Sequence, residues 1–167
     1  MLLNGPNLNL LGLRDPKIYG SATLKEIEAN VRSAASAVGY NLEARQTNHE
    51  GLLIDWVHEA IQGRQCAEEV HVAGIILNAG GYTHTSIALR DAIELASNLG
   101  IPTVEVHLSK IHEREEFRHV SLLRGVCIGQ VCGHGANGYT IGLDMLIVHF
   151  EKTKVQVRSD PLPGFSS

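Results

Sequence analysis

The sequence predicts one α/β domain, built on a five-stranded parallel sheet with helices on both faces. Apolar, strand-like runs alternate with amphipathic helical patterns along the chain, and this alternation is typical of parallel sheets with right-handed crossovers. The chain has 167 residues, which is the usual length of a single domain. Its 44% hydrophobic and 19% charged residues are ordinary for a protein with a buried core.

The five expected strands are short apolar or alternating runs between turn residues. They are residues 1–4, 40–47, 72–81, 102–109 and 125–133. The run 72–81 is continuously apolar and β-branched, so we expect it to be buried on both faces. The run 40–47 alternates between apolar and polar residues, as half-buried strands do. Residues 112–117 are expected to form only a short helical turn.

The four expected helices repeat apolar residues every three or four positions. They are residues 21–39, 49–63, 84–100 and 136–152. Thr23, with Glu26 three residues later, forms a capping box at the start of the first helix. Gly39 and Gly100 end the first and third helices. At the start of the second, we expect residues 48–50 to cap the helix rather than to bind a ligand.

The composition bears on the domain organisation of the chain and on the classes of function that it can have. We expect a catalytic domain over residues 1–154 and a loose tail over residues 155–167, which are rich in Pro, Ser and Gly. The net charge of −4 gives no support for binding to nucleic acid or an anionic membrane. The sequence has no run of 18 apolar residues and no charged-then-apolar leader, so we expect a soluble, cytoplasmic protein. Cys127 and Cys132 are expected to be small buried residues rather than disulfide partners.

Polar residues gather where the expected strands end. In parallel α/β sheets, ligands bind outside the carboxyl ends of the strands. The residues at these ends are Asn4 and Asn7, then 48–50, then Asn78, Gly80 and Gly81, and finally His107 and Ser109. We therefore expect a binding site at this edge, with Asn4 making a local turn bond.

Five segments, in this order, resemble type II 3-dehydroquinate dehydratases, also called type II dehydroquinases. They are LNGPNLNLLG, RDPKIYG, NHEG, LNAGGYTHTSIALRDA and VEVHLSKIHEREEFRHVS. The resemblance runs from Leu3 to about Leu143 and implies a flavodoxin-like fold, in agreement with the alternating pattern. It also implies a hydro-lyase that converts 3-dehydroquinate to 3-dehydroshikimate through an enolate, without a metal or an organic cofactor.

The resemblance implies that Tyr19 is the base and His107 the acid of this reaction. A phenol with an ordinary pKa of about 10 is a poor base at neutral pH, and Arg14 is implied to favour the phenolate. Asn7, with a bound water, is implied to stabilise the enolate. Histidine suits protonation of the leaving hydroxyl because its pKa lies near neutrality. Glu105, on the same face of the strand, is implied to orient His107 or a water.

The resemblance also implies a set of substrate-binding residues. They are Asn78, His84, Asp91, Leu108, Ser109 and Arg118. Leu108 and Ser109 would offer backbone N–H groups to the substrate carboxylate, and Arg118 would hold a hydroxyl. His84 is expected at the N-terminus of the third helix, where an anion binds readily.

Further residues bear on access and assembly. Gly80 and Gly81 let the backbone approach a ligand closely. The loop from Leu11 to Ala22 is long and polar, as lids are, and we expect it to close over the substrate. Asp91 matches a residue that reaches a neighbouring subunit's site in the family, which implies trimers assembled into a homododecamer. Arg114 is expected to form subunit contacts.

The chain departs from the family pattern at a few positions. Arg124, Gln130 and His134 stand where the family has other, mostly apolar or small, residues. The link from Gly63 to Ala73 is longer than usual. We expect these departures to lie away from the chemistry and to affect subunit packing.

Other functions remain open on the sequence. A module that binds phosphate or a nucleotide would need glycines or hydroxyls after the first strand, whereas LNGPNLNLLG has leucines and no GxGxxG motif. A signalling receiver would need an acidic pocket at the strand ends, and a Schiff-base dehydratase would need a lysine among apolar strand residues. His107, His112 and His119 lack the spacing of a HExxH metal site.

The implied reaction serves both aromatic amino-acid biosynthesis and quinate breakdown, and the sequence favours neither pathway.

Overall fold

The structure, a computed structural model, describes residues 1–13, 20–64 and 71–159, with residues 154–159 described by their backbone alone. The described chain contains a five-stranded parallel sheet in the order β2-β1-β3-β4-β5. The strands are β1 (Leu2–Asn4), β2 (Ala44–Gln46), β3 (Ile75–Asn78), β4 (Thr103–His107) and β5 (Gly129–Cys132). This order is that of a flavodoxin-like fold, so the expected fold is confirmed, and its switch point lies between β1 and β3.

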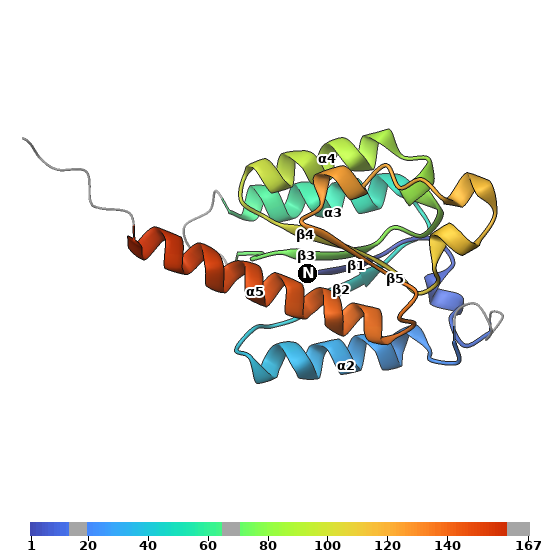
Figure 1. Ribbon diagram of the computed structural model, residues 1–167, viewed down its shortest axis with the longest axis horizontal. Helices are drawn as coiled ribbons and strands as arrows, with labels where there is room; N and C mark the ends of the chain where they lie inside the picture. The colour runs from blue at the N-terminus through green and yellow to red at the C-terminus, as the bar shows by residue number, and fades with distance from the viewer. Residues whose placement is uncertain (14–19, 65–70, 160–167) are drawn as a thin grey trace, which may run out of the picture.

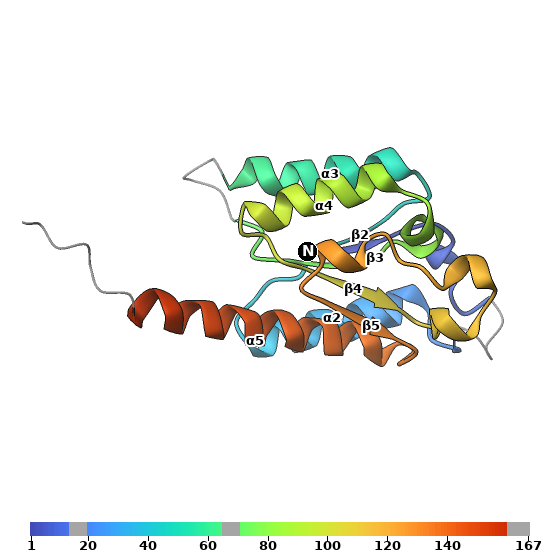
Figure 2. The ribbon, with the colours of Figure 1, turned by 45° about the horizontal axis from the view of Figure 1, so that its top comes forward.

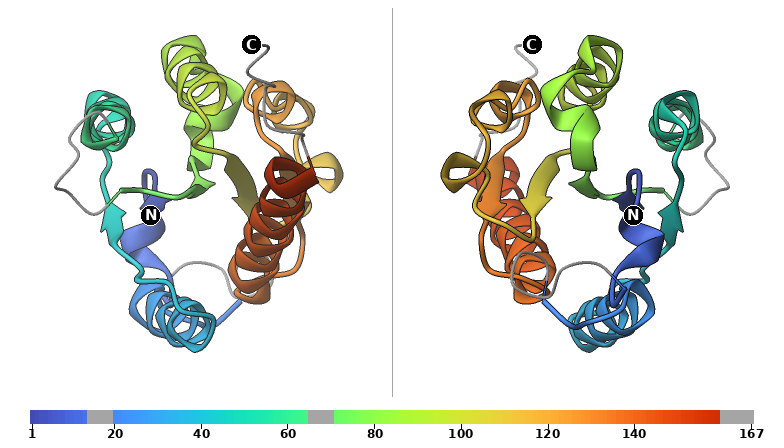
Figure 3. Two further views of the ribbon diagram at one scale, coloured as in Figure 1. Left: turned by 90° about the vertical axis from the view of Figure 1, so that its left-hand side faces the viewer. Right: turned by 90° about the vertical axis from the view of Figure 1, so that its right-hand side faces the viewer.

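The α-helices of the described chain cover both faces of the sheet, as Figures 1 and 2 show. They are α2 (Leu24–Ala37), α3 (Glu50–Gly63), α4 (Ile87–Asn98) and α5 (Asn137–Ser159). The pair α2 and α5 lies on one face and the pair α3 and α4 on the other, and the end-on views of Figure 3 show both layers. Each face has its own apolar core, with Val31 and Tyr139 in one and Val57 and Ile93 in the other.

Short 3-10 helices lie beyond the carboxyl ends of the strands, at the right of Figure 1. They are η1 (Leu8–Leu10), η2 (Gly80–His84), η3 (Ile111–Glu113) and η4 (Glu116–Arg118). A further one, η5 (Arg124–Val126), precedes β5. These turns carry the side chains at the edge of the sheet where we expect the site. None of the helices in the described ranges is long and apolar enough to cross a membrane.

The start of α4 differs from the prediction. The helix begins at Ile87, because the hydroxyl of Ser86 accepts the backbone N–H of Leu89 and caps the first turn there. His84 belongs to η2, so the expected position of His84 at a helix N-terminus is wrong.

The ends of the other helices agree with the prediction from the sequence only in part. The capping box of Thr23 and Glu26 is confirmed, with both of its reciprocal bonds present. The expected cap of α3 is wrong, since His49 occupies the N-cap position without a side-chain bond. The helix α5 continues to Ser159, past the expected domain end at 154. Residues 160–167 lie outside the described residues, as do 65–70 in the long link.

Candidate active site

A polar cavity of about 170 Å³ lies at the carboxyl edge of the sheet. It is lined by Pro6, Asn7, Leu8, Asn78, Gly80, Gly81, His84, His107, Leu108, Ser109, Ile111, Arg114 and Arg118. Of the expected site residues that the structure describes, all except Glu105 and Asp91 belong to this lining. The convergence of loops from separate parts of the sequence is therefore confirmed.

The remaining expected residues lie elsewhere. Glu105 is buried behind the cavity wall, in contact with His107. Asp91 is exposed on α4 and lies 3.4 Å from Arg90. Arg14 and Tyr19, the expected base and its cation, lie outside the described residues.

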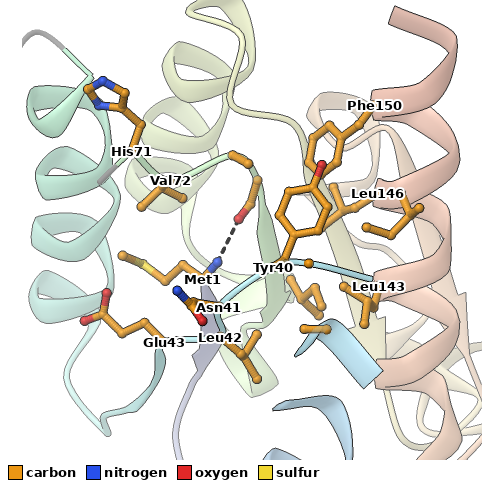
Figure 4. Close-up of a pocket in the computed structure, with 16 residues that line it drawn as sticks. Met1, Tyr40, Asn41, Leu42, Glu43, His71, Val72, Leu143, Leu146 and Phe150 are labelled. Atoms are coloured by element: carbon orange, nitrogen blue, oxygen red, sulfur yellow. Dashed lines mark hydrogen bonds between the residues drawn. The ribbon is translucent and has the colours of Figure 1, made fainter. Parts of the chain in front are cut away.

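A larger cavity, of about 490 Å³, lies at the opposite edge, by the amino ends of the strands (Figure 4). Its walls are largely apolar and include Tyr40, Leu143, Leu146 and Phe150. The amino group of Met1 donates to the carbonyl oxygen of Gly74 at its floor, at 2.9 Å. In α/β sheets ligands bind at the carboxyl edge, so the smaller polar cavity is the candidate site.

A buried polar network holds the strand ends beneath the cavity. The hydroxyl of Tyr139, on α5, donates to Asn4 Oδ1 at 2.8 Å and accepts from Asn78 Nδ2 at 2.8 Å. Burial raises the pKa of Tyr139 well above its usual value, so the hydroxyl keeps its proton. The expected local turn bond of Asn4 is thus wrong, since its side chain bonds with a residue far along the chain. Sequence reasoning missed Tyr139, and the signal for it was an asparagine in an otherwise apolar strand.

Asn7 reaches the cavity through an unusual backbone turn. It has a φ of 66°, in the left-handed region that asparagine tolerates better than most residues. Its backbone N–H donates to Asn48 Oδ1 at 2.9 Å, so Asn48 holds this loop in place. Gly5 allows the loop to pass closely over Ala79, the residue after β3, since a Cβ on Gly5 would lie 2.5 Å from the Ala79 carbonyl oxygen.

A carboxylate–histidine pair lies at the wall of the cavity, with His107 in the lining and Glu105 behind it. The Nε2 atom of His107 lies 2.7 Å from Glu105 Oε1, and both side chains are buried. Burial by itself raises the pKa of Glu105, but hydrogen bonds from His107, Thr83 and Ser121 and the charge of His107 hold that pKa below its usual value. Glu105 is therefore an ionised acceptor, so Nε2 of His107 carries a proton. No described residue is hydrogen-bonded to the second ring nitrogen, which can therefore exchange a proton with a ligand.

Glu105 has further donors that the sequence did not reveal. The hydroxyls of Thr83 and Ser121 donate to it, the latter at 2.7 Å and 2.9 Å from its two oxygens. Gln130 Nε2 donates to Glu105 Oε2 at 2.7 Å. The expectation that Gln130 lies away from the site is therefore wrong. A glutamate in a buried strand predicts such donors, but only the fold shows which ones they are.

A second histidine faces this pair across the cavity. The rings of His84 and His107 are stacked with centroids 6.5 Å apart. Nδ1 of His84 lies 2.8 Å from the carbonyl oxygen of Val120. Burial lowers the pKa of His84, and the charges of His107 and Arg118 lower it further. His84 is therefore neutral at neutral pH and acts as a hydrogen-bonding group rather than a cation.

Two arginines complete the lining. Arg118 lies with Nε 3.0 Å from Glu115 Oε2 and its guanidinium 5.0 Å from the centre of the Phe117 ring. Arg114, for which we expected subunit contacts, lines the cavity, with Nη1 3.5 Å from Ser109 Oγ. Guanidinium groups suit carboxylate and hydroxyl ligands. Across the described ranges, no group of three or more His, Cys, Asp and Glu side chains is placed to hold a metal ion.

The fold and this cavity together define a flavodoxin-like α/β protein with a polar cavity at the carboxyl edge of its sheet. The family model described as Dehydroquinase class II matches residues 1–147. The chain therefore belongs to the class II dehydroquinase family.

Comparison with individual relatives supports this assignment to the family. The chain is 51% identical over 148 residues to a 3-dehydroquinate dehydratase of Dinoroseobacter shibae, covering 89% of this chain and 91% of that one. It is 54% identical over 145 residues to one of Chelativorans sp., covering 87% and 93%. The crystal structure of a type II dehydroquinase from Butyrivibrio crossotus matches it with a TM-score of 0.80 at 40% identity, covering 87% and 94%.

Proposed function

We propose that this protein is a hydro-lyase that dehydrates 3-dehydroquinate to 3-dehydroshikimate. Membership of the class II dehydroquinase family supports this proposal. The observation that carries it is the cavity at the carboxyl edge, where amide, imidazole and guanidinium donors lie beside the Glu105–His107 pair. Such a cavity provides donors for a carboxylate and several hydroxyls next to a group that supplies a proton.

In the proposed reaction, Tyr19 as phenolate removes the proton next to the substrate ketone, and the charge of Arg14 favours the phenolate. The electron pair of the broken C–H bond moves into the carbonyl group and forms an enolate, which Asn7 and a water stabilise. The enolate then expels the neighbouring hydroxyl group. His107 protonates that group, so that it leaves as water. Glu105 balances the positive charge of His107 and holds its ring.

The remaining lining residues bind the substrate in this proposal. Asn78, His84 and the backbone N–H groups of Leu108 and Ser109 hold the carboxylate and ring hydroxyls, and Arg118 holds a further hydroxyl. The position of His84 in the turn η2 brings its ring beside His107. We place the reaction in the cytoplasm, in aromatic amino-acid biosynthesis or in quinate breakdown.

We also propose that the chain forms homo-oligomers, as trimers assembled into a dodecamer. On α4, the side chains of Ile87 and Leu95 are 64% and 47% exposed. They lie one turn before and one turn after Asp91, so the three share one face. An exposed apolar stripe of this kind is typical of a subunit contact. Light scattering measures the mass, and Asp91→Asn should raise KM if a neighbour completes the site. A fully active monomer would contradict the assembly.

The test is an absorbance assay that follows the conjugated enone of the product, repeated after borohydride treatment. Tyr19→Phe should lower kcat by about 100-fold or more with little change in KM. Tyr40→Phe, the same exchange at the opposite edge of the sheet, should behave like the wild type. Full activity of Tyr19→Phe would contradict the assignment of Tyr19 as the base. A folded wild-type protein that forms no enone would refute the proposed function, and loss of activity with borohydride would favour a lysine imine.

A further inference from the structure

We propose that Gln130 is a positioning residue for the reaction. Its side-chain amide completes the hydrogen bonding of the buried Glu105 carboxylate and so keeps the shared proton of the Glu105–His107 pair on His107. This inference rests on the proposed role of His107 as the acid. Gln130 does not line the cavity, so it acts through Glu105 and not through the substrate.

The contact is set by the register of the sheet. Glu105 of β4 pairs directly with Gln130 of β5, so their side chains leave the same face side by side. Nε2 of Gln130 lies 2.7 Å from Glu105 Oε2. Two positions further along the register, and hence on the same face of the sheet, His107 pairs with Cys132. The amide and the imidazole therefore approach the carboxylate from the same face.

The two oxygens of Glu105 depend on different donors. Oε1 contacts His107 at 2.7 Å, Ser121 at 2.7 Å and the hydroxyl of Thr83. Oε2 contacts Gln130 at 2.7 Å and Ser121 at 2.9 Å. Ser121 has one hydroxyl proton and can donate it to only one oxygen at a time. Among the described residues, Gln130 is therefore the one donor that contacts Oε2 and does not contact Oε1.

Removal of this amide changes where the proton resides. A buried carboxylate oxygen that lacks a donor binds a proton more tightly. The nearest available proton is on Nε2 of His107, 2.7 Å from the carboxylate. Transfer to Glu105 leaves a neutral imidazole, and a neutral imidazole is a far weaker acid than the imidazolium. Protonation of the leaving hydroxyl then becomes slower, while substrate binding is preserved.

The other ionisable groups around Glu105 do not supply this effect. They are His84, Cys127 and Cys132, and the charge of Arg124 acts on the two thiols. Burial raises the pKa of Cys127 to about 12 and that of Cys132 to about 11, so both thiols stay neutral. His84 has a lowered pKa and is neutral above about pH 7. The pair of Glu105 and His107 therefore governs the proton near the acid.

The experiment compares Gln130→Met, which keeps the length of the side chain but has no N–H donor, with Gln62→Met, the same exchange at the exposed end of α3. Gln130→Leu repeats the test with a second apolar side chain. We expect Gln130→Met to lower kcat about tenfold, the scale of one hydrogen bond to a charged group, with KM within about twofold. Gln62→Met should match the wild type.

A second readout needs no substrate. The carboxyl ¹³C resonance of Glu105, followed from about pH 3 to pH 8, should titrate at higher pH in Gln130→Met than in the wild type. An unchanged titration, or an unchanged kcat in a folded variant, overturns the proposal. If the wild-type protein forms no enone, the proposed function fails, and the resonance of Glu105 still decides whether Gln130 holds the proton on His107.

Discussion

Replacing Tyr139 by phenylalanine should destabilise the protein strongly, although it removes a single oxygen atom. The hydroxyl makes two hydrogen bonds of 2.8 Å, to Asn4 and to Asn78, and all three side chains are buried. Asn4 Nδ2 already has no hydrogen-bond partner among the described residues. In the variant, neither polar atom of the Asn4 side chain would be paired, and Asn78 Nδ2 would lose its partner as well, while Asn78 Oδ1 would still accept the backbone N–H of Gly80.

The magnitude follows from these lost partners. A buried polar group left without its partner costs about 1–3 kcal/mol, so two such groups lower the free energy of unfolding by about 3 kcal/mol. For a chain of this length, each kcal/mol corresponds to about 2–4 °C, which predicts a Tm lower by about 6–12 °C. Because Asn78 lines the cavity, the variant should also show a raised KM.

The assay is urea unfolding followed by far-UV circular dichroism, with the wild type and Tyr40→Phe as references. Tyr40 is half-buried, and its ring packs on Phe150 with centroids 5.6 Å apart, so the same chemical change there leaves the Asn4–Asn78 network intact. We expect a shift in the urea midpoint without a change in slope. A free energy of unfolding for Tyr139→Phe within about 0.5 kcal/mol of the wild type would refute the reasoning.

Two further predictions test backbone packing and buried charge. Gly5→Ala places a Cβ 2.5 Å from the Ala79 carbonyl oxygen and should lower the free energy of unfolding by about 2 kcal/mol. Gly81→Ala is the control, because a Cβ there meets open space. Equal losses of stability in the two variants, measured by thermal unfolding, would contradict the packing argument. The folded state holds the pKa of Glu105 below its usual value, so the unfolded chain binds more protons, and stability is lost as the pH falls below about 4.3. Urea titrations from about pH 3 to pH 6 should show a shallower acid loss for Glu105→Gln; parallel curves would count against an ionised Glu105.

Features that depend on neighbours in the sequence were predicted well. The capping box of α2 is correct because Thr23 and Glu26 meet within one helical turn. The Glu105–His107 contact is correct because residues two apart in a strand share a face. The cavity was predicted because parallel strands end at one edge, so Asn7, Asn78 and the fourth strand had to meet there.

Features that depend on how elements dock were not predicted. His84 was expected at the N-terminus of the third helix, but the hydroxyl of Ser86 caps α4 two residues later, so His84 lies in η2. Gln130 was judged remote because its distance from Glu105 along the chain conceals their pairing across β4 and β5. Arg114 was not expected in the cavity, because its place in a run of charged residues does not show which way it faces, and only the turns around it bring it there. Its subunit contact stays a prediction.

The sequence by itself determined the class of fold, the edge of the sheet that holds the site and the amides and histidine that reach it. These follow from hydrophobic periodicity and from the common direction of parallel strands, which are local properties of the chain. The tertiary structure alone decided the partners of the buried polar groups: Tyr139 for Asn4, and Thr83, Ser121 and Gln130 for Glu105. A buried polar atom requires a partner, but many donors along the chain satisfy that requirement, and only strand register and helix docking select among them.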